Sequence, residues 1–236
     1  MILLLCLYPG CQRFMADMTA IIDATIAAAQ AAIGESRSRQ LNARKNREIV
    51  IVAYRPEWPA EFARIAATLR GALGDLALRI DHIGSTSVAG LAAKDIVDVQ
   101  VTVADLNAMA LDPAFARMGC LRIAQNDHDH VPPTATGGDQ DWRKLMYRPP
   151  TEMRPTHIHV RRAGSANGRY ALLFRDYLRT HPLAAAAYAQ VKLALARNDS
   201  YDWDLYYDVK DPVCDIIMAG AEDWAAQTGW RIEHYA

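Results

Sequence analysis

The clearest pattern of apolar and polar positions in this chain lies over Ile96–Val103. Every second residue from Val97 to Val103 is a valine, and Asp98 and Gln100 fall between the valines. Successive side chains of a strand point to opposite faces of a sheet, so the pattern predicts a strand with one core face and one polar face. Asp98 and Gln100 are therefore expected side by side on the polar face.

Similar patterns predict the neighbouring elements. The segment Thr156–Arg162 alternates in the same way, with His157, His159 and Arg161 sharing one face. The apolar residues at 49–54 and 76–83 predict two more strands. A helix between these two strands is predicted because apolar residues recur there every three or four positions. They are Trp58, Phe62, Ile65, Leu69 and Leu73, with Pro59 near the start and Gly74 after the end.

The last third of the chain has a helical pattern. A first helix is predicted from Asn167 to the residue before Pro182, and a second over 183–197. A third helix is predicted over 212–227, with Ile216, Ile217 and Trp224 facing inward. The segment Val131–Asp139 is rich in Pro, Gly and Thr, as binding loops often are.

Residues 1–46 are predicted to form an N-terminal extension, with an Ala-rich helix over 18–33 followed by a polar linker. Met15 and Met18 offer alternative starts, and the apolar run Ile2–Tyr8 is too short and lacks the basic residues of a signal peptide. Residues 47–236 are predicted to form one domain, with an α/β core at 47–165 and a helical part at 166–236.

Composition narrows the function classes. The net charge of −1 argues against binding to bulk nucleic acid. The absence of an apolar run of about 18–20 residues predicts that the chain does not cross a membrane. Four cysteines without a C-x-x-C pair predict free thiols and a cytoplasmic protein. Cys120 and Cys214 lie in apolar surroundings and are expected in the core.

The small-residue loop of Gly84, Ser85, Thr86 and Ser87 precedes the Asp98 strand. Such a loop lets backbone N–H groups and hydroxyls approach phosphate oxygens. It is also compatible with an ordinary turn whose hydroxyl caps a helix. An acid on the next strand favours the phosphate interpretation, because a carboxylate can hold a divalent cation on the same phosphates.

Asp98 lies between valines, and a buried carboxylate needs a metal or a cationic partner such as Arg161. Gln100 can add a carbonyl oxygen but no charge. Asp95 has the opposite strand parity and can reach the site only from the loop end.

Histidines and basic residues add further candidates. His157 and His159 can bind a transition metal together, or hydrogen-bond to a carboxylate. The run Asp127–His130 is either a metal cluster or a solvated turn. Several basic side chains are candidates for phosphate contacts or for simple surface solvation. They are Arg143, Lys144, Arg154 and Arg161, with Lys192 and Lys210 as weaker candidates.

Several of these segments together resemble the GrpB family of nucleotidyltransferase-like proteins, which are sometimes fused to dephospho-CoA kinase. The resemblance covers about residues 50–230, and its most specific parts are His82–Val88 and Ile96–Asp98. The family's usual Asp-x-Asp corresponds here to Asp98-Val99-Gln100, and its usual Pro after the Lys is replaced by Asp95. The matching segments are Tyr54–Trp58, His82–Val88, Gly90–Lys94, Ile96–Asp98, Asp141–Lys144, His157–Val160, Leu173–Arg179 and Tyr207–Lys210.

The resemblance implies an α+β fold, with a nucleotidyltransferase-like mixed β-sheet flanked by helices and a C-terminal helical segment. It also implies transfer of a nucleotidyl group from a nucleoside triphosphate, with ATP expected, to an unknown acceptor, using Mg²⁺ or Mn²⁺. The alternatives are a catalytically degenerate nucleotide-binding or regulatory module and a metal-dependent phosphodiesterase.

Each candidate residue has an expected role in that reaction. Asp98 and His159 are the expected catalytic residues, and Asp98, Gln100 and His159 are the expected metal ligands. The expected phosphate ligands are Gly84, Ser85, Thr86, Ser87, Lys94, Arg143 and Arg161.

Overall fold

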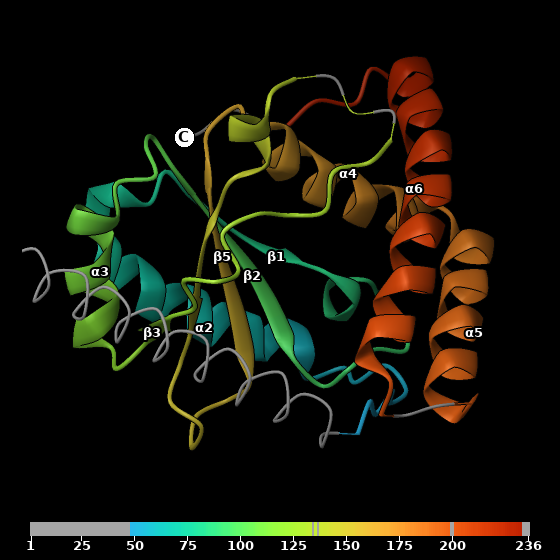
Figure 1. The fold of residues 1–236 in the computed structure, drawn as a ribbon, viewed down its shortest axis with the longest axis horizontal. Coiled ribbons are helices and arrows are strands. Elements are labelled where there is room, and N and C mark those ends of the chain that lie inside the picture. Colours follow the sequence, from blue (N-terminus) through green and yellow to red (C-terminus); the bar gives the residue numbers. More distant parts are fainter. Residues whose placement is uncertain (1–47, 134, 136, 199–200, 233–236) are drawn as a thin grey trace, which may run out of the picture. The chain divides into compact units, whose positions relative to one another are not determined.

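The computed structural model describes residues 48–133, 135, 137–198 and 201–232. These residues form a mixed five-stranded sheet with helices packed against it and further helices at the C-terminal end, which confirms the predicted α+β fold (Figure 1). The predicted helix at 18–33 and two of the cysteines, Cys6 and Cys11, lie outside the described residues. The predicted domain boundaries stay predictions.

The sheet has the strand order β1-β2-β5-β4-β3. Strand β2 pairs antiparallel with β1 and parallel with β5, and the two remaining pairs are antiparallel. The predicted strands at 96–103 and 156–162 are confirmed, the second with its predicted ends. The strands are β1 (Arg79–Ile83), β2 (Val97–Val103), β3 (Leu121–Arg122), β4 (Leu145–Arg148) and β5 (Thr156–Arg162).

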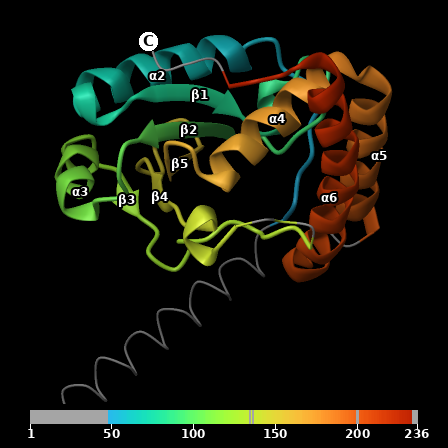
Figure 2. The same ribbon diagram turned by 90° about the horizontal axis from the view of Figure 1, so that it is seen from above.

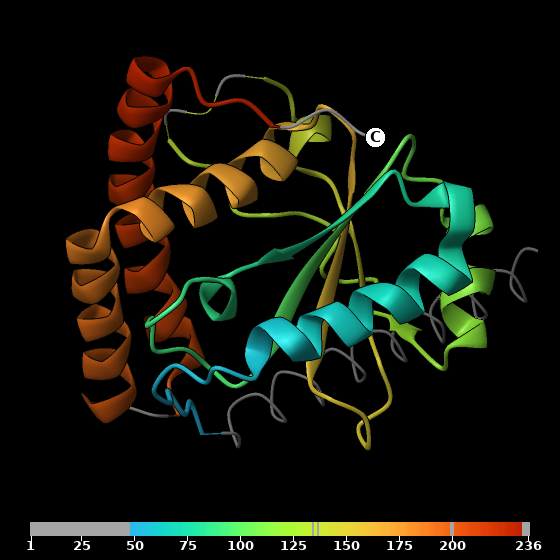
Figure 3. The same cartoon turned by 180° about the vertical axis from the view of Figure 1, so that it is seen from behind.

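The valine face of β2 lies in the main hydrophobic core, as predicted. It packs against helices α2 (Trp58–Leu73) and α3 (Ala108–Arg117), and the four valines are almost completely buried. Figure 3 shows α2 lying across the strands. Gly74 ends α2 with a positive φ of 52°, as its place in the pattern predicted. Cys120 and Cys214 are buried free thiols, which confirms the prediction for both.

The opposite face of the sheet lies against α4 (Ala166–Thr180). Helix α4 also packs on α5 (Pro182–Asn198) and α6 (Trp203–Thr228), and the three helices lie together in Figures 1 and 2. No helix in the described part of the chain is both long and apolar enough to cross a bilayer. Helix α4 therefore covers part of the polar face of the sheet.

Two predicted strands differ from the structure. Residues 49–54 form a single bridge, in which Val52 and Ala93 exchange two backbone hydrogen bonds of 2.8 and 3.0 Å. The partner of this segment is a loop, so no ladder extends from the bridge. The strand predicted at 76–83 begins only at Arg79, because Gly74–Leu76 form a 3₁₀ turn.

Helix α6 is longer than the pattern predicted. It begins at Trp203, where the Asp202 side chain accepts a 2.8 Å hydrogen bond from the Leu205 backbone N–H, and it continues through Pro212. The prediction that Ile216 faces inward was wrong, since 74% of this residue is exposed. The buried positions of α6 are Tyr206, Cys214, Met218, Ala221 and Ala225, and Ile216 lies off that stripe. Helix α3 and strand β4 were not predicted.

Candidate functional site

The parallel pairing of β2 with β5 brings three donor side chains together. In this register Asp98 lies opposite His157, and Gln100 lies opposite His159. Asp98 Oδ1 is 3.2 Å from His157 Nδ1 and 3.8 Å from His159 Nε2. One donor atom from each of the three residues lies within 4.8 Å of the other two. We call Asp98, His157 and His159 the strand triad.

Electrostatics favour an ionised Asp98 beside a neutral His159. Burial alone would raise the pKa of Asp98, but the two histidines hold it well below its ordinary value. Burial lowers the pKa of His159 to about 4, and the nearby charges of Arg161 and Lys144 act in the same direction. His159 Nδ1 is also buried without a hydrogen-bond partner among the described residues. A neutral imidazole can accept a metal ion or a proton, so the triad can act as a ligand set.

Gly84 makes room for the Asp98 carboxylate. Its φ of +67° is in the left-handed region, and a Cβ at this position would overlap Asp98 Oδ2 and lie 2.9 Å from Asp98 Cβ. Glycine is therefore required here for two reasons, the backbone conformation and the close approach of the acid. A phosphate contact by Gly84 stays a prediction.

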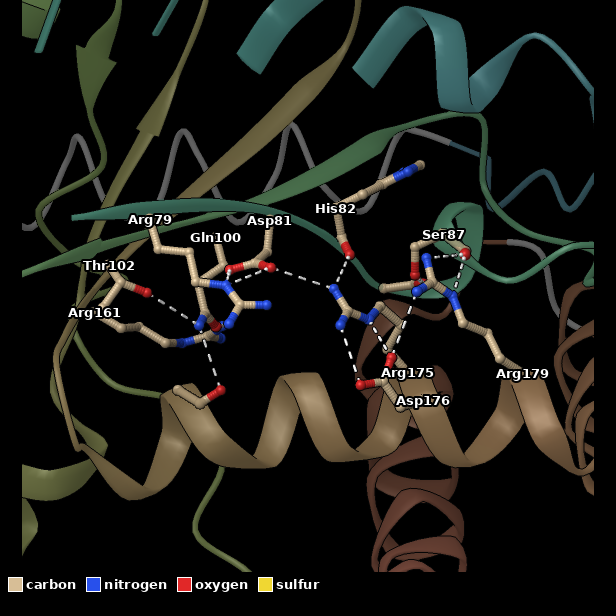
Figure 4. Close-up of polar contacts among 12 residues, drawn as sticks. Arg79, Asp81, His82, Ser87, Gln100, Thr102, Arg161, Arg175, Asp176 and Arg179 are labelled. Atoms are coloured by element: carbon tan, nitrogen blue, oxygen red, sulfur yellow. Dashed lines mark hydrogen bonds and ion pairs between the residues drawn. The ribbon is translucent and has the colours of Figure 1, made fainter. Parts of the chain in front are cut away.

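The turn after Gly84 is fixed by several hydrogen bonds. The Ser87 hydroxyl donates to the Gly84 carbonyl oxygen at 2.6 Å, and His82 Nε2 lies 3.0 Å from the Thr86 hydroxyl. Arg179 of α4 donates two bonds to the Ser87 carbonyl oxygen, at 3.1 and 2.9 Å, as Figure 4 shows. Thr86 and Ser87 are buried, which leaves Gly84 and Ser85 as the more accessible half of the predicted phosphate loop.

A lysine from the helical part reaches this turn. Lys192 of α5 is 2% exposed, and its Nζ donates to Ser85 Oγ at 2.8 Å and to the Ala92 carbonyl oxygen at 2.5 Å. Burial, together with the charges of Lys210 and Lys94, lowers the pKa of Lys192 to about 7. Lys192 was one of the weaker phosphate candidates in the sequence. The signal that was available is its place in a helical stripe with Ala185 and Tyr188, both of which are buried.

Lys94, a predicted phosphate ligand, lies among aromatic rings of α6. Its Nζ is 4.8–5.1 Å from the ring centroids of Trp203, Tyr206 and Tyr207, and 3.3 Å from the Tyr207 hydroxyl oxygen. These rings hold the cation by cation–π attraction. Lys94 is therefore held by α6, whereas Lys192 contacts Ser85 directly.

Gln100 and Arg161 have other partners than the predicted ones. Arg161 donates to Gln100 Oε1 at 2.7 Å and to Asp129 at 2.8 Å, and Gln100 donates to the Gly168 carbonyl oxygen of α4 at 3.3 Å. Figure 4 shows Gln100 and Arg161 lying between the sheet and α4. Gln100 is 1% exposed and Arg161 5%. The amide oxygen of Gln100 is thus directed at Arg161, and the Arg161 charge is paired with Asp129.

The remaining candidates lie in separate groups. Asp95 accepts a hydrogen bond from Trp58 and pairs with Arg55 and Arg154, so it takes no part in the triad. Arg143 is half-exposed and lies 3.7 Å from Asp127. Within the Asp127–His130 run, His128 contacts Asp127 and Asp139, Asp129 pairs with Lys144 and Arg161, and His130 lies 2.9 Å from Asp215. These side chains point to different partners and do not converge on one ion.

The fold and this arrangement define a class of α+β proteins with a glycine–serine turn, an acid-bearing strand and a helical C-terminal part. The family model for GrpB protein matches residues 48–219, and this chain belongs to the GrpB family. A crystal structure of conserved protein GrpB from Enterococcus faecalis is 26% identical, with a TM-score of 0.51, and the match covers 70% of this chain and 97% of that one.

Two relatives differ in how much of their own length is similar to this chain. A UPF0157 protein of Halalkalibacterium halodurans is 32% identical over 75% of this chain and 84% of its own length. A dephospho-CoA kinase of Mycolicibacterium paratuberculosis is 37% identical over 75% of this chain but only 46% of its own length. The chain thus spans about half the length of that kinase.

The contact between Gly84 and Asp98 predicts the effect of an alanine. Gly84→Ala should lower the free energy of unfolding by about 1–3 kcal/mol through overpacking, in addition to the strain of a positive φ. Gly90→Ala is the matched control, because Gly90 also has a positive φ but faces open space. Urea unfolding of both variants measures the difference, and equal losses would contradict a specific contact with Asp98.

The surroundings of Gln100 predict that an acid is not tolerated there. Gln100→Asp should destabilise the fold by about 1–3 kcal/mol, because a carboxylate cannot donate to the Gly168 carbonyl oxygen and is too short to replace the bond with Arg161. Gln140→Asp, at an exposed position, is the control. If Gln100→Asp is as stable as the wild type, the hydrogen bonds of the buried amide with Gly168 and Arg161 do not stabilise the fold.

His82 predicts a pH dependence of stability. Burial, helped by the charges of Arg179 and Arg175 and opposed by Asp98, lowers its pKa from 6.5 to about 4. As the pH falls from about 7 to about 5, the unfolded chain binds a proton at this residue and the folded chain does not. The folded state therefore loses on the order of 1–2 kcal/mol over this window. In urea titrations at the two pH values, His82→Gln should show a smaller drop in the free energy of unfolding than the wild type. An unchanged drop would contradict the role given to His82.

Proposed function

We propose that this chain binds a nucleoside triphosphate, with ATP expected, and transfers its nucleotidyl group to an acceptor hydroxyl. The observation that carries the proposal is the 2.8 Å hydrogen bond from Lys192 Nζ to Ser85 Oγ, at a turn packed against Asp98. A lysine amine from the helical part and an acid from the sheet therefore contact neighbouring residues of one turn. Triphosphate binding needs both, a positive charge near the oxygens and a carboxylate for a divalent cation.

The residues of the site have separate roles in this proposal. Gly84 and Ser85 meet the phosphates, while Thr86 and Ser87 hold the turn in shape through their buried hydroxyls. Lys94 and Lys192 offset the phosphate charge, and Arg143 is a further, half-exposed cation at the loop. Arg161 acts through its ion pair with Asp129 and supports the strand face.

Asp98 would hold the divalent cation, with His159 and His157 beside it. A bound divalent cation shields phosphate oxygens and lowers the pKa of an attacking hydroxyl. Of the two ions expected, Mg²⁺ prefers oxygen ligands, and two of the three donors here are nitrogens. The pKa of His159, lowered to about 4, makes it a weak base, which favours a ligand role over proton abstraction.

Mycobacterial relatives named dephospho-CoA kinase contain a region similar to this chain, which supports phosphate-group chemistry in proteins of this kind. We also propose a cytoplasmic location, since Cys120 and Cys214 are buried free thiols.

A second candidate function is a nucleotide-binding regulatory module without turnover. Gln100 favours this second function. It occupies the position of the second acid in the family's usual Asp-x-Asp, and its side chain is buried against α4. In that case the turn and the lysines bind the nucleotide, and Asp98 has no second carboxylate on its strand face to complete a two-ion site.

Binding and transfer can be measured separately. Calorimetry with ATP should show weaker binding for Lys192→Met than for the wild type, by about tenfold or more, because one charge contact to phosphate is worth more than about 1.4 kcal/mol. Arg197→Met is the matched control, since it removes one positive charge from an exposed position on the same helix.

Labelled-ATP transfer and pyrophosphate release, measured with Mg²⁺ and Mn²⁺ over a panel of acceptors, should fall by at least about tenfold in Asp98→Asn. Tight binding without any turnover would favour the regulatory module. If the wild type does not bind a nucleoside triphosphate at all, both functions are ruled out.

A further inference from the structure

The strand triad combines two imidazole nitrogens with one carboxylate oxygen. All three side chains are partly accessible, with 28% of the Asp98 side chain, 22% of His157 and 15% of His159 exposed. The same face of the sheet is closed at Gln100, where α4 covers it. Solvent can therefore reach the polar face at the triad, while the neighbouring position on the same strand is sealed.

We propose that Asp98, His157 and His159 form a binding site for one late first-row transition-metal ion, such as Fe²⁺, Co²⁺ or Zn²⁺, in preference to Mg²⁺. The inference deepens the proposed function by naming the class of ion, and it rests on that function for the ion's role.

The chemistry of the donors sets the preference. Mg²⁺ demands an octahedral shell of oxygens and gives up its waters reluctantly, so a site with two nitrogens suits it poorly. Imidazole suits Fe, Ni, Cu and Zn, and the affinity of divalent ions for such ligands rises from Mn²⁺ to Cu²⁺ and falls at Zn²⁺. Three protein donors with further positions left to solvent are typical of catalytic metal sites, in which a substrate or water completes the shell.

The backbone positions the donors firmly. Asp98 lies between Val97 and Val99, and the two histidines flank Ile158. These three apolar residues are buried in the main core. A ligand set on the central strands of a sheet loses little freedom on binding an ion. His159 gives a second reason, since its Nε2 lies 3.8 Å from Asp98 Oδ1, too far for a hydrogen bond. An ion between these donors would satisfy Nε2.

Metal titration of the full chain tests the site directly. After treatment with a chelator, the wild type should bind one equivalent of Co²⁺, followed by visible absorption, and Mg²⁺ at a hundredfold excess should not displace it. His157→Ala, His159→Ala and Asp98→Asn should each weaken Co²⁺ binding by at least about tenfold, since even the loss of a residue that supports a ligand costs 10–100-fold.

The loop histidines provide a matched control. His128→Ala and His130→Ala remove imidazoles that contact acids outside the triad, and both should bind Co²⁺ like the wild type. Circular dichroism identifies any variant that fails to fold. Pulsed EPR of the Cu²⁺-loaded wild type needs no variant, and should show nitrogen couplings from two imidazoles. Couplings from fewer than two, or equal Co²⁺ binding by His159→Ala, would overturn the proposal.

The metal site and the nucleotide site can fail separately. Co²⁺ binding that depends on the triad, in a chain that binds no nucleotide, would support the metal site and refute the proposed function. ATP binding that depends on Lys192, with Mg²⁺ displacing Co²⁺ at equal concentration, would support the proposed function and refute the transition-metal site.

Discussion

The parallel pairing of β2 with β5 is the interaction on which the rest of the structure depends. It places the valines of β2 beside Ile158 and Val160 in the main core, so the opposite side chains of both strands share a polar face. The same register sets Asp98 against His157, with His159 one step further along. A shift of one residue would move these donors into the core, where an unpaired carboxylate is very costly. Burial of the valines therefore fixes the geometry of the candidate site.

The polar face is divided into two halves by α4. In the closed half, Gln100, Arg161 and Asp129 satisfy one another, and Gly168 of α4 completes the network. In the accessible half, Asp98 packs against Gly84, and the turn that follows is held by Arg179 and Lys192. Charged side chains thus form a closed network at one end of the face, whereas the Asp98 side chain stays partly exposed at the other. This division gives a physical account of a glutamine at the position next to the strand acid.

Local periodicity predicted much of this fold. The alternation in β2 and β5 and the helical spacing of α2 depend only on residues close in sequence, and each identified the correct element and the correct buried face. The shared face of Asp98 and the two histidines follows from the same alternation, once the two strands are neighbours. The triad could therefore be anticipated in part from the sequence.

Contacts between distant segments could not be predicted in this way. Lys192 meets Ser85 across 107 positions of the chain, and Gln100 meets Gly168 across 68. The bridge between Val52 and Ala93 is likewise a tertiary contact, and it explains why an apolar run became a single pair and not a strand. The extension of α6 through Pro212 depends on packing of its buried stripe, which outweighs the local cost of a proline.

The most direct test of a composite site between the sheet and the helical part is a crystal structure of the chain with Co²⁺ and a non-hydrolysable ATP analogue. Anomalous scattering locates the ion without reference to the protein. We expect an ion bound by Asp98 and the two histidines, with the phosphates at Gly84 and Ser85 within reach of Lys192. Phosphates bound away from this turn, or an ion bound away from Asp98, would contradict it.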